Sequence, residues 1–131
     1  MKSIAQIIIG LPVDGFFDYL IPDHLIGRLS IGQRVAVSFG RKKAVGYIVG
    51  FSDHSDIKTL KALDEPLEDF PLVSENQLEL GRWIADYYGC FWGEAVEAML
   101  PFSVRKKKTL LLTAFDQKKF EIADPAPHEL F

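Results

Sequence analysis

The chain has 131 residues, of which 48% are hydrophobic and 25% are charged, and its formal net charge is -3. This composition is typical of a soluble globular protein with one core. It excludes a broadly basic surface that would hold nucleic acid nonspecifically, although it leaves room for a small local basic site. Cys90 is the single cysteine, which excludes an internal disulfide and a cysteine-based zinc site.

The compartment follows from the same features. The apolar run at residues 4–11 is too short to cross a bilayer, and Lys2 without a small-residue cleavage site makes a poor signal peptide. A lone cysteine suits a reducing compartment, and we expect Cys90 to be a small buried residue. The sequence therefore predicts a cytoplasmic protein without a membrane partner.

The first half of the chain is rich in strand signals. Five segments carry the β-branched, aromatic or alternating pattern of strands, namely residues 3–11, 16–22, 32–39, 44–51 and 60–63. The third and fourth segments predict a hairpin joined by the basic connection GRKK, residues 40–43. Within the fourth, Gly46 and Gly50 are expected at a bulge or a close approach.

Asp18 stands out in the second segment, FFDYLIP. Strand alternation places it on one face with Phe16 and Leu20, and places Phe17 and Tyr19 on the other face. An unpaired buried carboxylate is costly, so Asp18 must reach solvent, accept hydrogen bonds or serve a ligand. The local pattern alone favours acceptance of backbone N–H bonds at a strand end, or exposure at a sheet edge.

The character of the sequence changes at Ser74, which forms a capping-box pattern with Gln77 ahead of a helical apolar repeat. Gly89 suits the left-handed position after that helix. A second helix is predicted at 93–100, before Pro101. The fold class is therefore α+β, a small and mainly antiparallel β-barrel or curled sheet followed by two C-terminal helices.

Aromatic residues recur in the first helix at helical spacing. Trp83, Tyr87 and Tyr88 are predicted to be core or domain-interface residues.

Residues 1–102 are expected to form one domain. Residues 103–131, which begin with a basic stretch, are expected to be a linker and the start of a following domain.

Signatures of catalysis are missing from the sequence. It has no P-loop, dinucleotide fingerprint, HExxH, paired CxxC or GxSxG elbow. His24, His54 and His128 lie in loop-like or tail sequence, and the acidic run 64–69 is typical of solvated surface. We therefore expect no catalytic residue and no metal ligand in this chain.

Five pieces of the sequence occur in a defined order: FDYLIP (17–22), GQRVAVSFGRKKAVGYIVG (32–50), LKAL (60–63), WIADYY (83–88) and GEAVEAMLP (93–101). In order and spacing they resemble the N-terminal domain of the primosomal protein N′ family, the bacterial replication-restart helicases PriA. The resemblance implies a domain that binds the 3′ end of the nascent leading strand at an arrested fork.

In that family a winged-helix domain, two helicase lobes with a zinc-binding insertion and a C-terminal domain follow. The resemblance thus implies a fragment that ends where the winged helix would begin, or a chain that never had the motor. ATP, Mg and Zn would belong to the absent domains, so no cofactor is expected in this chain.

The resemblance also implies roles for five residues. Asp18 would accept a hydrogen bond from the terminal 3′-hydroxyl, between the aromatic residues Phe17 and Tyr19. Gly40 would let the backbone approach the terminal base, and Lys61 would reach that base or its phosphate. Stacking and backbone contacts tolerate any base, so binding would be largely independent of base identity. The alternatives are two core aromatics, a turn glycine and a solvated lysine.

The basic connection offers phosphate contacts. Arg41, Lys42 and Lys43 are short in span and adjacent to Gly40, although they also suit a solvated hairpin tip. If about two phosphates are neutralised, the salt slope of binding to a single strand should be near -1.4.

The sequence therefore predicts a noncatalytic DNA 3′-end-binding module. Its expected partners are single-stranded DNA 3′ ends and forked DNA, the other domains of the helicase, primosome proteins and single-strand-binding protein. The alternative is a protein-interaction domain that docks on helicase lobes or single-strand-binding protein and touches DNA only incidentally.

Overall fold

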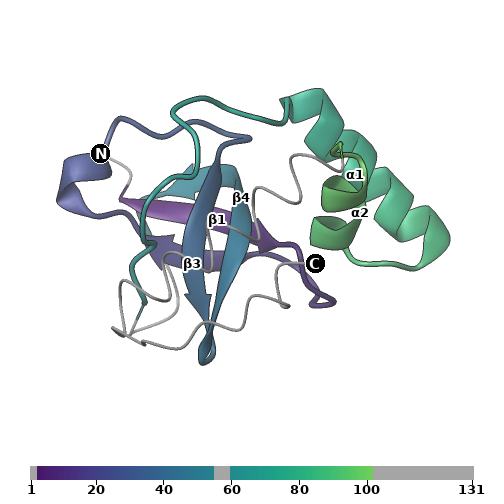
Figure 1. Cartoon of the computed structure of the whole chain (residues 1–131), viewed down its shortest axis with the longest axis horizontal. Helices are drawn as coiled ribbons and strands as arrows, with labels where there is room; N and C mark the ends of the chain where they lie inside the picture. Colours follow the sequence, from purple (N-terminus) through teal and green to yellow (C-terminus); the bar gives the residue numbers. More distant parts are fainter. Residues whose placement is uncertain (1–2, 55–59, 102–131) are drawn as a thin grey trace, which may run out of the picture.

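The computed structural model describes residues 3–54 and 60–101 (Figure 1). In these ranges the elements are β1 (Ile4–Ile9), β2 (Phe17–Leu20), a 3-10 helix η1 (Asp23–Leu25), β3 (Arg34–Phe39), β4 (Lys42–Ser52), α1 (Glu75–Tyr88) and α2 (Trp92–Ala98). The strands form one sheet in the order β2-β1-β4-β3, with every neighbouring pair antiparallel. The predicted α+β fold is confirmed, and the predicted hairpin is β3–β4.

Both faces of β1 are buried over residues 7–9, which explains the three successive isoleucines there. Ile7 and Ile9 point into an inner cluster that also contains Val35 and Val37 of β3. Ile8 points the other way, into a cluster shared with the helices. A strand covered on both faces needs apolar residues at successive positions rather than at alternate ones. The inner cluster is the core of the curled sheet.

Residues 60–66, which we call the seam, close the curled sheet because they bridge β2 and β3. The Leu20 N–H donates to the Lys61 carbonyl at 2.9 Å, which joins the segment to β2. The Asp64 N–H donates to the Ala36 carbonyl at 2.8 Å, which joins it to β3. The extended segment predicted at 60–63 is therefore confirmed, and it connects two strands at opposite edges of the sheet order.

A bulge in β4 confirms the expectation for its glycines. Gln6 pairs with Gly50, but the register shifts before Ile7, which leaves Val49 as the extra residue. At Gly46 a Cβ atom would lie only 2.2 Å from Cγ2 of Ile7, so β1 and β4 approach closely there.

Helix α1 begins and ends as predicted. The Ser74 side chain accepts from the Gln77 N–H at 3.1 Å, and the Gln77 side chain accepts from the Ser74 N–H at 2.8 Å. Gly89 ends the helix with φ 70°, in the left-handed region. The capping box and the glycine fix the length of α1.

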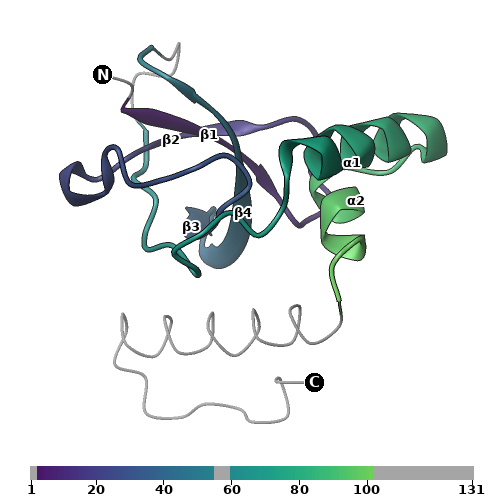
Figure 2. The same cartoon turned by 90° about the horizontal axis from the view of Figure 1, so that it is seen from above.

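The two helices lie side by side on one side of the sheet (Figures 1 and 2). Gly81 of α1 faces Val96 of α2, and Gly93 of α2 faces the carbonyl of Ile9. These small residues let the backbones approach, so α2 lies directly on β1.

The prediction that Cys90 is buried is wrong. Cys90 is exposed, because it follows the helix cap at Gly89 in the connection between the helices. Of the two alternatives predicted for Trp83, Tyr87 and Tyr88, the core is wrong, since their side chains are 58%, 68% and 72% exposed. A domain interface stays a prediction. Helix α1 buries its other face, and the aromatic face remains open. The predictions for residues 103–131 lie outside the described residues.

Candidate nucleic-acid interface

The candidate site lies where β2 meets the tip of the β3–β4 hairpin. Phe17 of β2 and Phe39 of β3 contact edge to face, with ring centroids 5.2 Å apart. The Tyr19 hydroxyl donates to the Ser38 carbonyl at 2.8 Å. These strands occupy opposite edges of the sheet order, so the contacts exist because the sheet curls and the seam closes. Phe17 packs against the inner cluster and Tyr19 belongs to it. The alternative prediction, that these two aromatic residues contribute to the core, is therefore confirmed.

Lys61 reaches the same place from the seam. Its ammonium group donates to the Gly40 carbonyl at 3.2 Å, and its side chain is exposed. Phe17, Tyr19, Gly40 and Lys61 are thus brought together, although they come from three separate segments.

Gly40 and Arg41 form the two-residue turn between the paired residues Phe39 and Lys42. Gly40 has φ 63°, a conformation that tight hairpin turns often need and that glycine adopts without cost. A Cβ atom at Gly40 would meet no atom within 4 Å, so the space beside it is open. The turn alone accounts for the glycine, and the open space leaves its backbone accessible to a ligand.

The three cations of the basic connection differ in their surroundings. Strand β4 begins at Lys42, so the connection itself is shorter than predicted. Arg41 and Lys42 are exposed. The Lys43 side chain is only 6% exposed, and its ammonium group forms an ion pair with Asp64. Arg41 and Lys42 are therefore the exposed cations of the basic connection, whereas the charge of Lys43 is already compensated.

Asp18 does not share a face with the aromatic residues beside it. It pairs with Gln6 of the neighbouring strand β1 and lies on the outer face of β2, where Phe16 and Leu20 are 48% and 40% exposed. Its side chain is half-buried, and Oδ1 is shielded from solvent. The structure thus places Asp18 at a sheet edge, one residue from the group formed by Phe17, Tyr19, Gly40 and Lys61 but on the other face.

The electrostatics at the hairpin tip centre on Tyr19. Burial raises the pKa of its hydroxyl above 10.0, and the nearby Asp64 carboxylate raises that pKa further. The hydroxyl therefore stays protonated and keeps donating to Ser38 at neutral pH.

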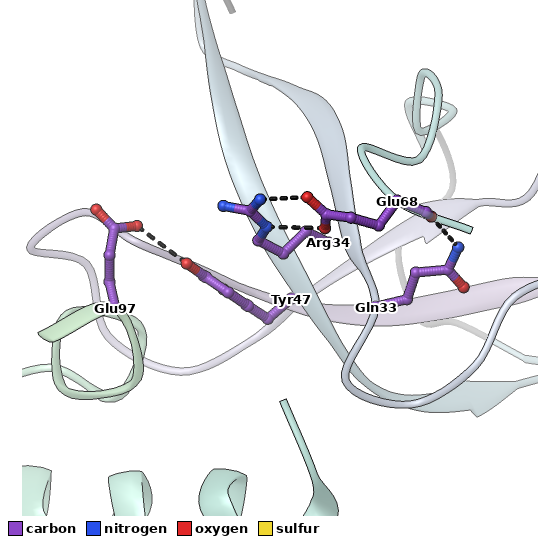
Figure 3. A network of polar contacts seen from close by, with 5 residues as sticks. All are labelled: Gln33, Arg34, Tyr47, Glu68 and Glu97. Atoms are coloured by element: carbon purple, nitrogen blue, oxygen red, sulfur yellow. Dashed lines mark hydrogen bonds and ion pairs between the residues drawn. The ribbon is translucent and has the colours of Figure 1, made fainter. Parts of the chain in front are cut away.

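A second polar cluster, missed by the sequence analysis, lies inside the molecule (Figure 3). Nε of Arg34 donates to Glu68 Oε1 at 3.0 Å, and Nη2 binds the other carboxylate oxygen. The side-chain amide of Gln33 donates to the Glu68 carbonyl at 2.6 Å. The Tyr47 hydroxyl donates to Glu97 Oε2 at 3.3 Å, which links β4 to α2.

This cluster corrects the prediction of solvated surface for Glu68, whereas Glu65 and Asp69 of the same acidic run are exposed as predicted. Arg34 is 1% exposed and Glu68 is 9% exposed, so their charges compensate one another within the protein. The signal that could have identified the pair is the arginine at the start of an otherwise apolar strand, because a buried guanidinium requires an acid. The cluster joins the 64–71 segment and α2 to the sheet.

Other kinds of site were sought in the described ranges. Among residues 3–54 and 60–101, no group of three or more His, Cys, Asp or Glu side chains is arranged to hold a metal ion. No helix in that part of the chain combines the length and apolar character needed to cross a membrane.

Comparison with known proteins places this geometry in a family. Residues 6–101 match the family model described as the 3′ DNA-binding domain. The replication restart protein PriA of Bacillus subtilis is 34% identical over 110 residues, which cover 80% of this chain and 14% of the relative. PriA of Haemophilus influenzae is 30% identical over 130 residues, which cover 98% of this chain and 17% of the relative.

PriA of Rickettsia felis is 35% identical over 107 residues, which cover 79% of this chain and 16% of the relative. The chain thus spans less than a fifth of the length of these curated relatives. The matched residues include β2, β3, β4, both helices, the seam and the last four residues of β1. The chain belongs to the family of PriA 3′ DNA-binding domains.

Proposed function

We propose that this domain binds the 3′-terminal nucleotide of a DNA strand at the hairpin tip and that Asp18 selects a free 3′-hydroxyl. The observation that carries the proposal is the contact between Lys61 and Gly40. An exposed ammonium group is held beside an open stretch of backbone, and such a pair can receive a phosphate and a base without reading the sequence.

Each residue at the tip has a separate role in this proposal. The Gly40 backbone approaches the terminal base, and Lys61 contacts that base or its phosphate. Arg41 and Lys42 contact phosphates further along the strand, because their charges are exposed. None of these contacts depends on base identity.

Asp18 supplies selectivity for the end. A carboxylate accepts a hydrogen bond from a hydroxyl but repels a phosphate of like charge. The seam is hydrogen-bonded to β2 at Leu20, so a nucleotide bound across the part of the β2 edge that precedes Leu20 can touch residues from both faces of this strand. The half-buried position of Asp18 holds the carboxylate at this edge.

The test compares two labelled oligonucleotides, one ending in a 3′-hydroxyl and one in a 3′-phosphate, by fluorescence anisotropy. The native chain should prefer the hydroxyl by about tenfold, a ratio expected for one hydrogen bond to a charged group. Asp18→Asn should bind both ends alike, whereas Asp14→Asn, which neutralises an exposed loop carboxylate, should keep the preference. Equal binding of both ends by the native chain would refute the proposal.

A second candidate function is a protein-docking module. The exposed aromatic face of α1 favours it, since the Trp83 and Tyr87 rings stack at 5.1 Å with 16° between their planes. Exposed aromatic patches are enriched at protein interfaces. On this alternative the domain docks on other parts of the restart helicase or on single-strand-binding protein. Replacing Trp83 and Tyr87 together by serine would then abolish docking without changing DNA affinity.

A further inference from the structure

The β3–β4 hairpin tip is held by contacts beyond its own strand ladder. One is the Tyr19–Ser38 hydrogen bond, and another is the Lys61–Gly40 hydrogen bond. A two-residue turn carried only by its hairpin would be free to bend away from the seam. What fixes the tip therefore also fixes the distance between Gly40 and Lys61.

The ion pair between Lys43 and Asp64 lies at the base of this tip. Lys43 also donates to Ser38 Oγ at 3.0 Å, and its side chain is 6% exposed against 37% for Asp64. An ammonium group removed from water to that extent needs a compensating charge. Without the Asp64 carboxylate, Lys43 would have to turn toward solvent and release the base of the hairpin.

The ion pair is adjacent to the contact at the DNA site. Lys43 lies three residues after Gly40, and Asp64 lies three residues after Lys61. The two connections therefore join the same two segments, one at the tip of the hairpin and one just behind it. Asp64 is further anchored to β3, since its N–H donates to the Ala36 carbonyl at 2.8 Å.

We infer that Asp64 is a positioning residue for DNA binding, because its ion pair with Lys43 holds Gly40 against Lys61. The inference rests on the proposed site at the hairpin tip, but it does not depend on selection of the 3′-hydroxyl. It gives Lys43 a structural role, in place of the phosphate contact that the sequence analysis predicted for it.

The sign of one effect separates positioning from plain electrostatics. Asp64→Asn removes a negative charge from the neighbourhood of the site, and that change alone would strengthen binding to a polyanion. If Asp64 instead positions the tip, Asp64→Asn weakens binding although the protein has become less acidic. The two accounts thus predict opposite changes in affinity.

The experiment measures the affinity of native chain, Asp64→Asn and Glu65→Gln for one labelled single strand with a free 3′-hydroxyl. Glu65 is the matched control, because it is the next residue and its ion pair with His24 is open to solvent. We expect Asp64→Asn to bind about fivefold more weakly, in the range of couplings between neighbouring groups. Glu65→Gln should bind at least as tightly as native. Native or tighter binding by Asp64→Asn would overturn the inference.

Two further measurements exclude a general loss of structure. Asp64→Glu keeps the charge and should recover most of the affinity. In Asp64→Asn, amide hydrogen exchange should rise at Phe39 and Lys42, the last ladder pair before the turn, while α1 keeps its native protection. Equal loss of protection throughout the domain would show a purely structural role and overturn the inference.

Failure here is distinguishable from failure of the proposed function. A native chain that binds both 3′ ends alike would refute the role of Asp18, and the affinities of Asp64→Asn and Glu65→Gln would still decide the role of Asp64. Unchanged exchange at Phe39 and Lys42 together with unchanged affinity in Asp64→Asn would refute the positioning role alone.

Discussion

At the scale of single residues, the helices depend on two glycines that differ in what they face. A Cβ atom at Gly93 would lie 1.8 Å from the Ile9 carbonyl oxygen, which belongs to a paired strand and cannot move away. A Cβ atom at Gly81 would lie 2.6 Å from Cγ2 of Val96, a buried side chain whose helix would have to shift slightly. The two positions therefore differ in how an added methyl group can be accommodated.

We predict that Gly93→Ala lowers the free energy of unfolding by about 3 kcal/mol, since overpacking against backbone is costly. Gly81→Ala should lower it by less than Gly93→Ala does, because alanine favours the helix by about 1 kcal/mol and so offsets part of the overpacking against Val96. Urea unfolding measures both values. A Gly81→Ala variant less stable than Gly93→Ala would contradict this account of the packing.

Tyr47 makes the free energy of unfolding depend on pH in the alkaline range. Burial raises the pKa of its hydroxyl above 10.0, the neighbouring Glu97 carboxylate raises that pKa further, and Arg34 opposes the rise. Above pH 10 the unfolded chain releases this proton while the folded chain retains it. The stabilisation is therefore complete below that pH and is lost as the pH rises.

The corresponding prediction concerns the slope of stability against pH. Between pH 10 and pH 11 the native chain should lose up to about 1.4 kcal/mol more than Tyr47→Phe does, the value for one proton. Tyr19 should keep a further alkaline loss in both proteins, because burial also raises its pKa. Urea unfolding at several pH values tests this, and equal slopes would contradict it.

Sequence reasoning succeeds at this scale where a residue has a local signal. Ser74, Gln77 and Gly89 could be assigned because caps are set by neighbours within one helical turn. Glu68 could not, since its burial depends on Arg34, which is distant in the sequence. Cys90 could not either, because exposure depends on how the two helices connect.

At the scale of elements, the β3–β4 hairpin turn could need Gly40 for two reasons: its positive φ, or the open space beside its backbone. Gly40→Ala places a Cβ atom at φ 63°, which costs about 1 kcal/mol of stability. Asparagine tolerates this conformation better, so Gly40→Asn should fold with little loss. The added side chain would nevertheless occupy the open space where a base could approach the backbone.

We therefore expect Gly40→Asn to keep the urea midpoint of the native chain. It should bind single-stranded DNA about tenfold more weakly, because the loss of one contact costs about 1.4 kcal/mol. Arg28→Gln, at an exposed arginine outside the hairpin, is the control for handling and concentration. Native affinity in Gly40→Asn would show that this glycine serves only the turn.

The elements themselves were predictable for physical reasons. Alternation revealed β3, and an isoleucine-rich run revealed β1. Pattern could not show that residues 60–66 bridge two strands, because that depends on the curl of the whole sheet. It also could not separate Lys43 from Lys42, since pairing with Asp64 is a tertiary contact.

At the scale of the whole molecule, the net charge of -3 limits DNA binding to local contacts. With Lys43 compensated by Asp64, Arg41 and Lys42 are the exposed cations of the hairpin. Two neutralised phosphates predict a slope of about -1.4 for log K against log salt concentration on a single strand.

Replacing Arg41 by glutamine should make that slope shallower by about 0.7, the value for one phosphate contact. Anisotropy titrations at several salt concentrations measure it for the native chain and the variant. A native slope much steeper than -2 would mean that cations elsewhere in the chain also contact the strand.

The seam gives the interface a place in the order of folding. Leu20 is hydrogen-bonded to Lys61 of the seam although β3 and β4 lie between them in the sequence. Bringing the two residues together costs conformational entropy of the intervening chain, and this cost is offset only once the long-range contacts form. We expect seam residues to show low φ-values, with their contacts absent from the folding transition state. A chain with an open seam would separate Lys61 from Gly40, so it could acquire secondary structure before it forms the proposed DNA site.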